Sequence, residues 1–245
     1  MINTFNESSL HKTLKSLYSS GKSENCEVKL NGKIYDVINK DGTIIEIQTR
    51  NLSKLLAKIS DVILQKRKIK IVYPLVQEKT IETFTSDGSL IKRRKSPVHL
   101  SIYDAILELM HLYPVLLNEN VEVEILFVSI IEKRLQEDSK VQSKNKKRRF
   151  CKDWNKSDKC LKKIFSTKIF SLPSDYISLI PKTCLPIFCA KDISLALKND
   201  KRLPARSAKT SHALLWLLSH LELIEYVKIE NRSRYYKVKE AHTYN

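Results

Sequence analysis

The stretch that decides the fold is Gly32–Asn51, GKIYDVINKDGTIIEIQTRN. Its β-branched and apolar residues favour two short strands, and Asp41-Gly42 between them is a typical hairpin turn. Side chains two apart on a strand point the same way, so Glu46 and Gln48 share one face of the second strand. A hairpin that closes over Asp41-Gly42 brings Asp36 of the first strand beside them. The stretch therefore predicts two carboxylates and a carboxamide at one edge of a sheet.

These carboxylates lie among residues typical of a buried sheet. A single acidic residue in a strand usually belongs to a solvated face. Here the neighbours are Ile, Val and Tyr on both strands, and a charge among such residues needs a partner or a metal ion. Two oxygen donors held by adjacent strands suit Mg²⁺ or Mn²⁺. The pattern predicts a metal site at Asp36 and Glu46.

The order of parts resembles the PD-(D/E)XK nuclease superfamily. A first helix carries Glu7, Asp36 follows, and Glu46-Ile47-Gln48 then precedes another helix. The resemblance implies an α/β restriction-endonuclease-like fold. It also implies that Asp36 and Glu46 hold the metal, Glu7 supports it and Gln48 positions a water molecule. The string IIEIQTRNLSKL further resembles a bacterial family of unknown function that joins such a domain to a helical C-terminus.

Gln48 departs from the pattern of that superfamily, in which the third motif position is usually Lys. An amide orients a water molecule but supplies no positive charge. Three explanations follow: the metal alone activates water, Lys54 or Lys58 takes the role of the missing lysine, or the site is inactive. Both lysines lie on the polar face of the helix expected over Leu52–Leu64, where a nucleic-acid backbone would pass.

Charge is distributed unevenly along the 245 residues. Residues 1–128 contain 18 Lys+Arg and 15 Asp+Glu, a net charge of +3, whereas residues 129–245 contain 26 and 12, a net charge of +14. Such asymmetry is typical of proteins that bind polyanions. The sequence shows neither a signal peptide nor an apolar run of about 18 residues, which disfavours a membrane. We therefore expect a cytoplasmic protein that binds nucleic acid, with its five cysteines as reduced thiols.

The chain around the central hairpin is expected to complete an α-β-β-β-α-β order. Residues 6–18 form a helix whose His11 lies one turn from Glu7 and is interpreted as a surface residue. A buried strand covers residues 69–75 and a second hairpin covers residues 77–95. Arg93 and Arg94 of that hairpin either hold a phosphate backbone or guard an exposed sheet edge.

Composition divides the chain into a nuclease-like domain, residues 1–130, a basic linker, residues 131–163, and a C-terminal domain, residues 164–245. The linker contains the low-complexity run SKNKKRRF, which is expected to bind phosphates loosely. Trp154 in the same segment either stacks on a base or packs against a domain.

The C-terminal domain looks like a winged helix-turn-helix. Pro204 is suited to begin a long helix ending at Leu221, and a hairpin across Glu230-Asn231-Arg232 forms the wing. Recognition helices meet the groove near their N-terminus, and wings reach phosphates. The residues expected to contact DNA are Arg206, Lys209 and Thr210 on the helix, with Arg232 and Arg234 on the wing. The other possibility for the wing is packing against a partner protein.

These features together predict a metal-dependent endonuclease that hydrolyses double-stranded DNA. Two alternatives come from other classes of protein. One is a non-catalytic DNA-binding regulator in which an inactive nuclease fold serves as a scaffold, and the other is a protein adaptor. Fold does not determine function, so the choice among them depends on the site.

Overall fold

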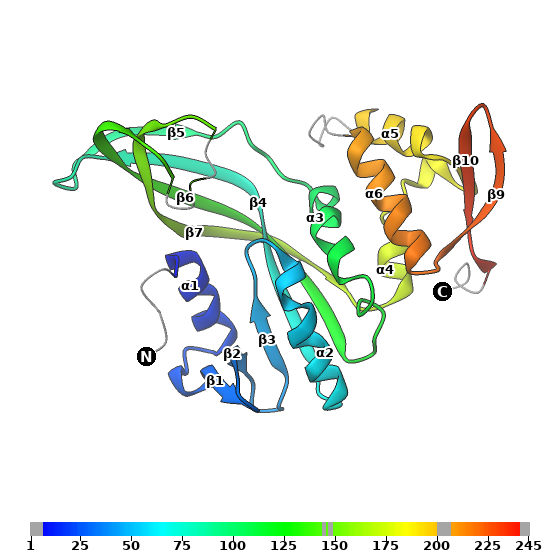
Figure 1. The fold of residues 1–245 in the computed structure, drawn as a ribbon, viewed down its shortest axis with the longest axis horizontal. Coiled ribbons are helices and arrows are strands. Elements are labelled where there is room, and N and C mark those ends of the chain that lie inside the picture. The colour runs from blue at the N-terminus through cyan, green and yellow to red at the C-terminus, as the bar shows by residue number, and fades with distance from the viewer. Residues whose placement is uncertain (1–6, 144–145, 147–148, 200–206, 241–245) are drawn as a thin grey trace.

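A sheet of seven strands dominates the molecule (Figure 1). The computed structural model describes residues 7–143, 146, 149–199 and 207–240. The strands are β1 Cys26–Leu30, β2 Lys33–Ile38, β3 Ile44–Ile47, β4 Ile69–Phe84, β5 Leu90–Lys95, β6 Val121–Val141 and β7 Lys152–Phe170. Their order is β1-β2-β3-β4-β6-β7, and β5 pairs with β4. Strands β3, β4 and β6 are parallel and the other pairs are antiparallel. The expected mixed α/β architecture is confirmed.

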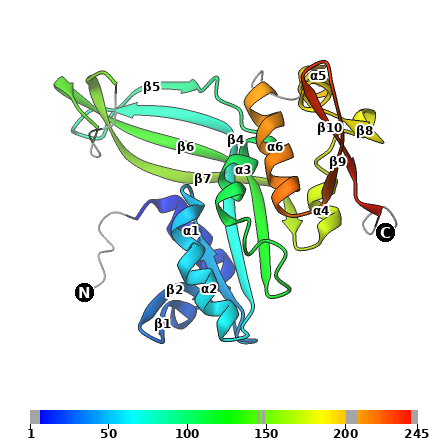
Figure 2. The same ribbon diagram turned by 45° about the vertical axis from the view of Figure 1, so that its right-hand side comes forward.

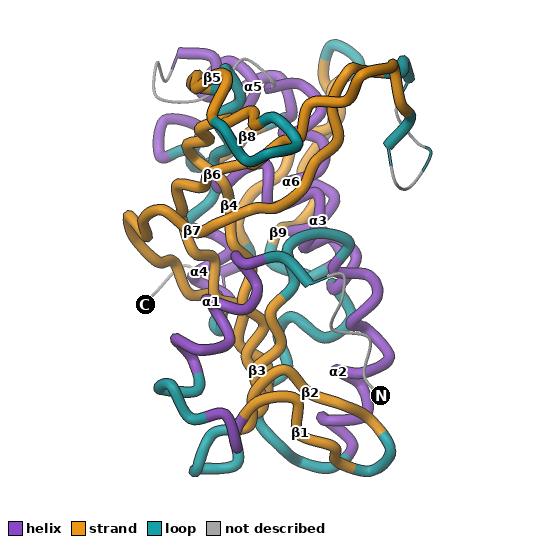
Figure 3. The backbone as a smooth tube through the Cα atoms, turned by 90° about the vertical axis from the view of Figure 1, so that its left-hand side faces the viewer, coloured by secondary structure: helices purple, strands orange, loops and turns teal. Residues whose placement is uncertain are grey.

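Helices cover both faces of the sheet where it is built from β1–β4. Helix α1, Ser9–Tyr18, inserts Leu10 and Leu14 into one apolar cluster. Helices α2, Leu56–Leu64, and α3, Ile102–Leu109, contribute to a second, larger cluster. Figure 3 shows strands β1–β3 between α1 and α2. Short 3₁₀ helices lie at Ser23–Asn25, Leu52–Leu55, Met110–Leu112 and Lys182–Cys184.

The central hairpin forms as expected. The turn is held by the Thr43 N–H, which donates to Asp41 Oδ1 at 3.0 Å, and Gly42 adopts φ +82°, a conformation that favours glycine. The resulting register places Val37 opposite Ile45. The next residues along the two strands, Asp36 and Glu46, are therefore neighbours.

Strand β4 continues through Pro74 and beyond residue 75, where the sequence predicts that the strand ends. Two backbone N–H groups of this segment, those of Ile44 in β3 and Gln48 just after it, donate to carbonyls of even-numbered residues on the β4 side. The acceptor of the Gln48 N–H is the carbonyl of Val72. The backbone of Pro74, two residues later, faces the same side, but β3 ends its pairing at Val72. The missing N–H of proline therefore interrupts no ladder, and β4 runs on to Phe84.

The prediction of a basic linker at residues 131–163 is wrong, and so is a domain boundary at residue 130. Strands β6 and β7 pair antiparallel through most of this segment, from Val123 opposite Phe170 to Val141 opposite Lys152. Residues 144–145 and 147–148, in the run SKNKKRRF, lie outside the described part. The sequence does not reveal these strands, because lysines on an exposed sheet resemble those of a linker. Several bulges also interrupt the alternation of apolar residues.

The C-terminal part forms a second small sheet with helices beside it (Figure 2). Its elements are α4 Pro173–Ile177, β8 Ile187–Phe188, α5 Ala190–Asn199, α6 Ser207–His220, β9 Ile224–Glu230 and β10 Ser233–Val238, with strand order β8-β10-β9. The hairpin expected across residues 230–232 is confirmed. This part shares one continuous apolar cluster with α2 and α3.

Helix α6 is buried on nearly every side from residue 210 onward, the part whose side chains are described. From residue 210 to residue 221 the exposed side chains are His212 and His220, and Thr210 is only 5% exposed. Trp216 packs edge-on against Tyr113, which follows α3, with ring centroids 5.3 Å apart. The α3 side therefore covers a helix that a winged-helix protein would present to DNA. In the described ranges no helix is long and apolar enough to cross a membrane.

Candidate active site

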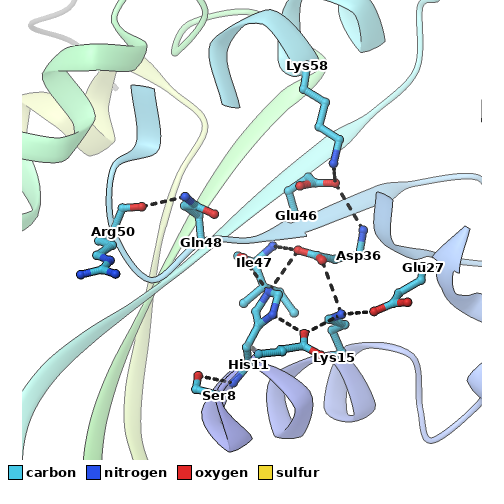
Figure 4. A network of polar contacts seen from close by, with 11 residues as sticks. Ser8, His11, Lys15, Glu27, Asp36, Glu46, Ile47, Gln48, Arg50 and Lys58 are labelled. Atoms are coloured by element: carbon cyan, nitrogen blue, oxygen red, sulfur yellow. Dashed lines mark hydrogen bonds and ion pairs between the residues drawn. The ribbon is translucent and has the colours of Figure 1, made fainter. Parts of the chain in front are cut away.

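Asp36 and Glu46 meet where strand β2 leaves its partner β3. The two strands stop backbone pairing at Val37 and Ile45. Beyond that point the Ile47 N–H donates to Asp36 Oδ2 at 2.8 Å, so a side chain replaces the missing backbone partner. The Asp36 N–H in turn points to Glu46 Oε1 at 3.3 Å. The opening between the strands thus collects two carboxylates and the carbonyl of Ile47 (Figure 4).

His11 closes this opening from helix α1. Its Nε2 lies 2.8 Å from the carbonyl oxygen of Ile47 and 3.3 Å from Asp36 Oδ2, while its Nδ1 contacts Glu7 Oε1. A carbonyl and a carboxylate are both acceptors, so both ring nitrogens carry protons and His11 is an imidazolium. Burial alone would lower the pKa of His11, but the bond and charge of Asp36 and the charge of Glu7 outweigh it and raise the pKa. His11 therefore sits in the structure as a cation among three oxygens.

Lys15 neutralises the remaining acids on this side of the sheet. The lysine is 7% exposed. Its Nζ lies 2.6 Å from Glu7, 2.8 Å from Glu27 and 3.8 Å from Asp36. Burial opposes the ionisation of Asp36, but the hydrogen bonds and charges of His11, the Ile47 N–H and Lys15 leave the pKa of Asp36 below its ordinary value. Asp36 is therefore a carboxylate at neutral pH.

Glu46 turns toward the other helix layer. The Nζ of Lys58, on α2, lies 2.5 Å from Glu46 Oε1 and 4.7 Å from the centroid of the Tyr35 ring. Glu46 is only 4% exposed. Its burial, together with the nearby charge of Asp36, raises the pKa of Glu46 to about 6 despite the opposing effect of Lys58. A buried carboxyl with such a pKa is characteristic of functional sites as well as of structural ion-pair networks.

Gln48 and Lys54 lie apart from this network. Gln48 Nε2 donates to the backbone oxygens of Arg50 at 2.7 Å and Asn51 at 3.4 Å, which holds the turn after β3. These contacts give Gln48 a structural role and do not aim it at the opening. Lys54 is exposed in the 3₁₀ helix before α2. Of the two lysines considered as replacements for the missing motif lysine, Lys58 is the one that reaches a carboxylate.

The oxygens of the opening suit a divalent ion chemically, but protein cations occupy them. Asp36, Glu46 and the Ile47 carbonyl are hard donors of the kind Mg²⁺ and Mn²⁺ prefer. Each already accepts a hydrogen bond from His11, Lys58 or a backbone N–H. Within the described residues no group of three or more His, Cys, Asp and Glu side chains is placed to hold a metal. An ion here would take the place of the His11 imidazolium.

The residues predicted to contact nucleic acid have different surroundings. Arg93, on β5, pairs with Glu82 at 2.6 Å, while Arg94 beside it is exposed. Arg232 and Arg234 are exposed on the β9–β10 hairpin, as a wing requires. Thr210 is buried and cannot reach a groove in this arrangement. Arg206 and the side chain of Lys209 lie outside the described part of the structure.

Sequence reasoning underestimated His11 and did not consider Lys15. Both are central to the polar network, and the interpretation of His11 as a surface residue is wrong because Asp36 and Ile47 pack over it. A usable signal was present: Glu7, just before α1, and His11 and Lys15 on the helix are spaced four residues apart, so one acid and two basic residues lie on the same side.

Two comparisons relate the chain to known proteins. Residues 8–171 match the family model described as a domain of unknown function, DUF8091. An uncharacterised protein of Treponema pallidum (strain Nichols) is 33% identical over 197 residues, which cover 79% of this chain and 73% of that protein. No solved structure matches. The matched segment runs from the cap of α1 to the end of β7 and so contains both the opening and the long strands. The chain therefore belongs to the DUF8091 family.

Proposed function

We propose that this protein is a DNA-binding, metal-dependent endonuclease whose active site is the opening between β2 and β3. One observation carries the proposal: Asp36 and the Ile47 carbonyl place their oxygens around a single positive nitrogen, His11 Nε2. A pocket that gathers oxygens around a positive charge is suited to a divalent cation. The order α1, β1–β3, α2, β4 is also the order expected of the PD-(D/E)XK superfamily.

The proposed roles follow from the contacts. Asp36, ionised at neutral pH, and the Ile47 carbonyl would hold Mg²⁺ or Mn²⁺, with Glu46 beside them. When bound, the ion supplies an activated water and neutralises charge on the phosphate. Lys58 supplies the positive charge that Gln48 lacks, through its contact with Glu46. Glu7 orients His11 and Lys15 and so acts through them.

Nicking of supercoiled plasmid tests this function. Wild-type protein is incubated with plasmid in Mg²⁺, in Mn²⁺ or in EDTA, beside Asp36→Asn, Glu46→Gln and Glu24→Gln. Glu24 is exposed, lies outside the network and serves as the matched control. We expect nicking that requires the metal, is lost in the first two variants and persists in the control. Nicking that survives both substitutions would reject the assignment.

A non-catalytic DNA-binding protein is the second candidate, and a specific observation favours it. His11, Lys15 and Lys58 pair with the four acids Glu7, Glu27, Asp36 and Glu46, so the site is nearly neutral without any metal. An inactive scaffold would keep such a network for stability. Binding of plasmid without nicking in either metal would identify this second function.

A further inference from the structure

The distal parts of four strands form an arm that extends past the helices. We define the arm as residues 79–84 of β4, β5, residues 130–141 of β6 and residues 152–161 of β7. Figures 1 and 2 show it reaching beyond α1, α2 and α3, at the end of the molecule opposite β9 and β10. Asp158 joins the arm to helix α1, because it accepts hydrogen bonds from the backbone N–H and hydroxyl of Ser9.

The strand register places six of the arm's cations on one face, whereas Arg93, Lys95 and Lys133 fall in the rows of the opposite face. Residues directly opposite one another in neighbouring strands point to the same side of a sheet. One row across the arm is Arg94, Ile81, Glu132 and Lys159. The next row on the same face is Lys92, Thr83, Arg134 and Lys156. Lys79 is also on this face, because it lies two residues before Ile81. The basic face therefore consists of Lys79, Lys92, Arg94, Arg134, Lys156 and Lys159.

Glu132 is the one acid in these rows, and its contacts verify the assignment of the face. Its carboxylate lies 2.6 Å from Arg134, 2.9 Å from Lys156 and 3.5 Å from Lys79. Three of the six cations thus contact a single acid that is 2% exposed. Lys92 and Arg94 are exposed, and neither forms an ion pair with another of the described residues. The face carries a formal excess of five positive charges.

The cations of the basic face act on one another, and Lys159 also interacts with Arg50, which lies near the candidate active site. Burial lowers the pKa of Lys159, and the charges of Lys156, Arg50 and Lys79 lower it further. Arg50 lies at the end of the turn that follows β3, four residues after Glu46. The near end of the basic face therefore adjoins the turn that follows β3, and a duplex that continued past Lys159 would reach that turn.

We propose that the basic face of the arm binds the phosphodiester backbone of a nucleic-acid duplex. This proposal rests on the proposed function only for the direction in which the duplex runs. It assigns binding to a β surface, because α6, the expected recognition helix, is covered by α3 and Tyr113. Arg134 stacks on Trp154 at 3.5 Å from the ring centroid, so its guanidinium is held in place before any ligand arrives. DNA and RNA share the phosphodiester chemistry, and the experiment separates them.

The test measures binding without cleavage. Fluorescent DNA and RNA duplexes of about 20 base pairs, two helical turns, are titrated in EDTA at several salt concentrations. Lys92→Ala/Arg94→Ala is compared with Lys22→Ala/Lys29→Ala, which removes the same charge from exposed positions at the β1 edge of the sheet. We expect the arm variant to bind on the order of tenfold more weakly, with a salt slope smaller by about 1–2, and the control to bind like wild type.

Three results would overturn the proposal. They are equal losses in both variants, loss in Arg232→Ala/Arg234→Ala of the wing with none in the arm variant, and binding to phosphatidylserine vesicles with none to either duplex. Tighter binding of either the DNA or the RNA duplex would support the proposal and would identify which nucleic acid the basic face binds. Failure of the proposed catalysis is recognised separately, because a protein that binds through the arm but nicks no plasmid leaves this inference intact.

Discussion

Lys58 and Glu46 form a half-buried ion pair that joins helix α2 to strand β3, with Nζ and Oε1 2.5 Å apart. The carboxyl is almost fully covered, whereas the lysine side chain is 23% exposed. The pair is therefore asymmetric: solvent can replace the carboxyl as a partner of Lys58, but little can replace Lys58 as a partner of the carboxyl.

Lys58→Met should destabilise the protein at pH 7. It leaves a buried acceptor without its charged partner, which costs about 1–3 kcal/mol of unfolding free energy. Lys54→Met, at an exposed position of the 3₁₀ helix before α2, should cost almost nothing. Urea unfolding of the two variants makes the comparison. Adding Glu46→Gln to Lys58→Met should recover most of the loss, and an unrecovered loss would mean that Lys58 stabilises α2 by packing alone.

The raised pKa of Glu46 predicts a distinct pH dependence. The folded protein holds this proton up to about pH 6, whereas the unfolded chain releases it near the ordinary value of 4.5. Protonation of Glu46 therefore favours folding below about pH 4.5, and this advantage disappears as the pH rises to about 6, by up to about 2 kcal/mol. Relative to wild type, Glu46→Gln should gain stability across that interval. Parallel stability curves for the two proteins would contradict this prediction.

Glu132 predicts the opposite pH dependence. Burial opposes its ionisation, but bonds from Lys156 and Arg134 and the charge of Lys79 lower its pKa to about 2. Its stabilising effect is present above pH 4.5, the ordinary value, and is lost as the pH falls toward 2, by at most about 3 kcal/mol. Glu132→Gln should therefore weaken the protein at pH 7 and progressively less toward pH 3. Glu78→Gln, exposed on β4, is the control, and it should change stability equally little at every pH.

Replacing His11 should strengthen the binding of a divalent ion. His11→Gln removes a positive charge that lies beside Asp36 Oδ2 and the Ile47 carbonyl, and repulsion between charges only a few ångströms apart is worth a factor on the order of ten or more. Calorimetric titration with Mn²⁺ measures the affinity directly. His99→Gln, whose ring bonds the Gln77 carbonyl, leaves the opening unchanged and should bind Mn²⁺ like wild type. Weaker binding by His11→Gln would instead make the imidazole a contributor to the metal site.

The packing of α6 predicts that the two parts of the chain unfold together. Trp216 stacks on His220 at 3.7 Å and meets Tyr113 edge-on, and the apolar cluster around them is continuous. Trp216→Ala should cost about 2–3 kcal/mol, less than for a fully buried tryptophan. Calorimetry should show one transition for wild type. Two separated transitions in wild type would mean that the shared cluster does not couple the parts.

The local features were readable in the sequence, whereas features set by distant packing were not. The turn at Asp41-Gly42, the cap at Ser8 and the leucine stripe of α1 depend on neighbours within a few residues. The placement of Asp36 beside Glu46 followed from that turn. The continuation of β4 through Pro74 depends instead on where β3 ends, which no local pattern records.

The covering of α6 and the role of His11 were also beyond local reasoning. Leucines occur around much of α6 because both the α3 side and the α5 side pack on it, so its sequence lacks a clear polar face. His11 looks like any polar residue on an amphipathic helix until Asp36 and Ile47 are brought over it. Lysines in β7 conceal a strand because the arm has few apolar neighbours to mark one side as inward.

The alternation of side chains along β6 also constrains how the arm can change in length. Glu132 and Arg134 share a face because one residue separates them. Adding one residue before Glu132 would turn the following side chains of β6 to the reverse side, whereas adding two would restore them. Relatives of this protein should therefore differ in arm length by even numbers of residues, or accompany an odd change with a bulge that resets the phase.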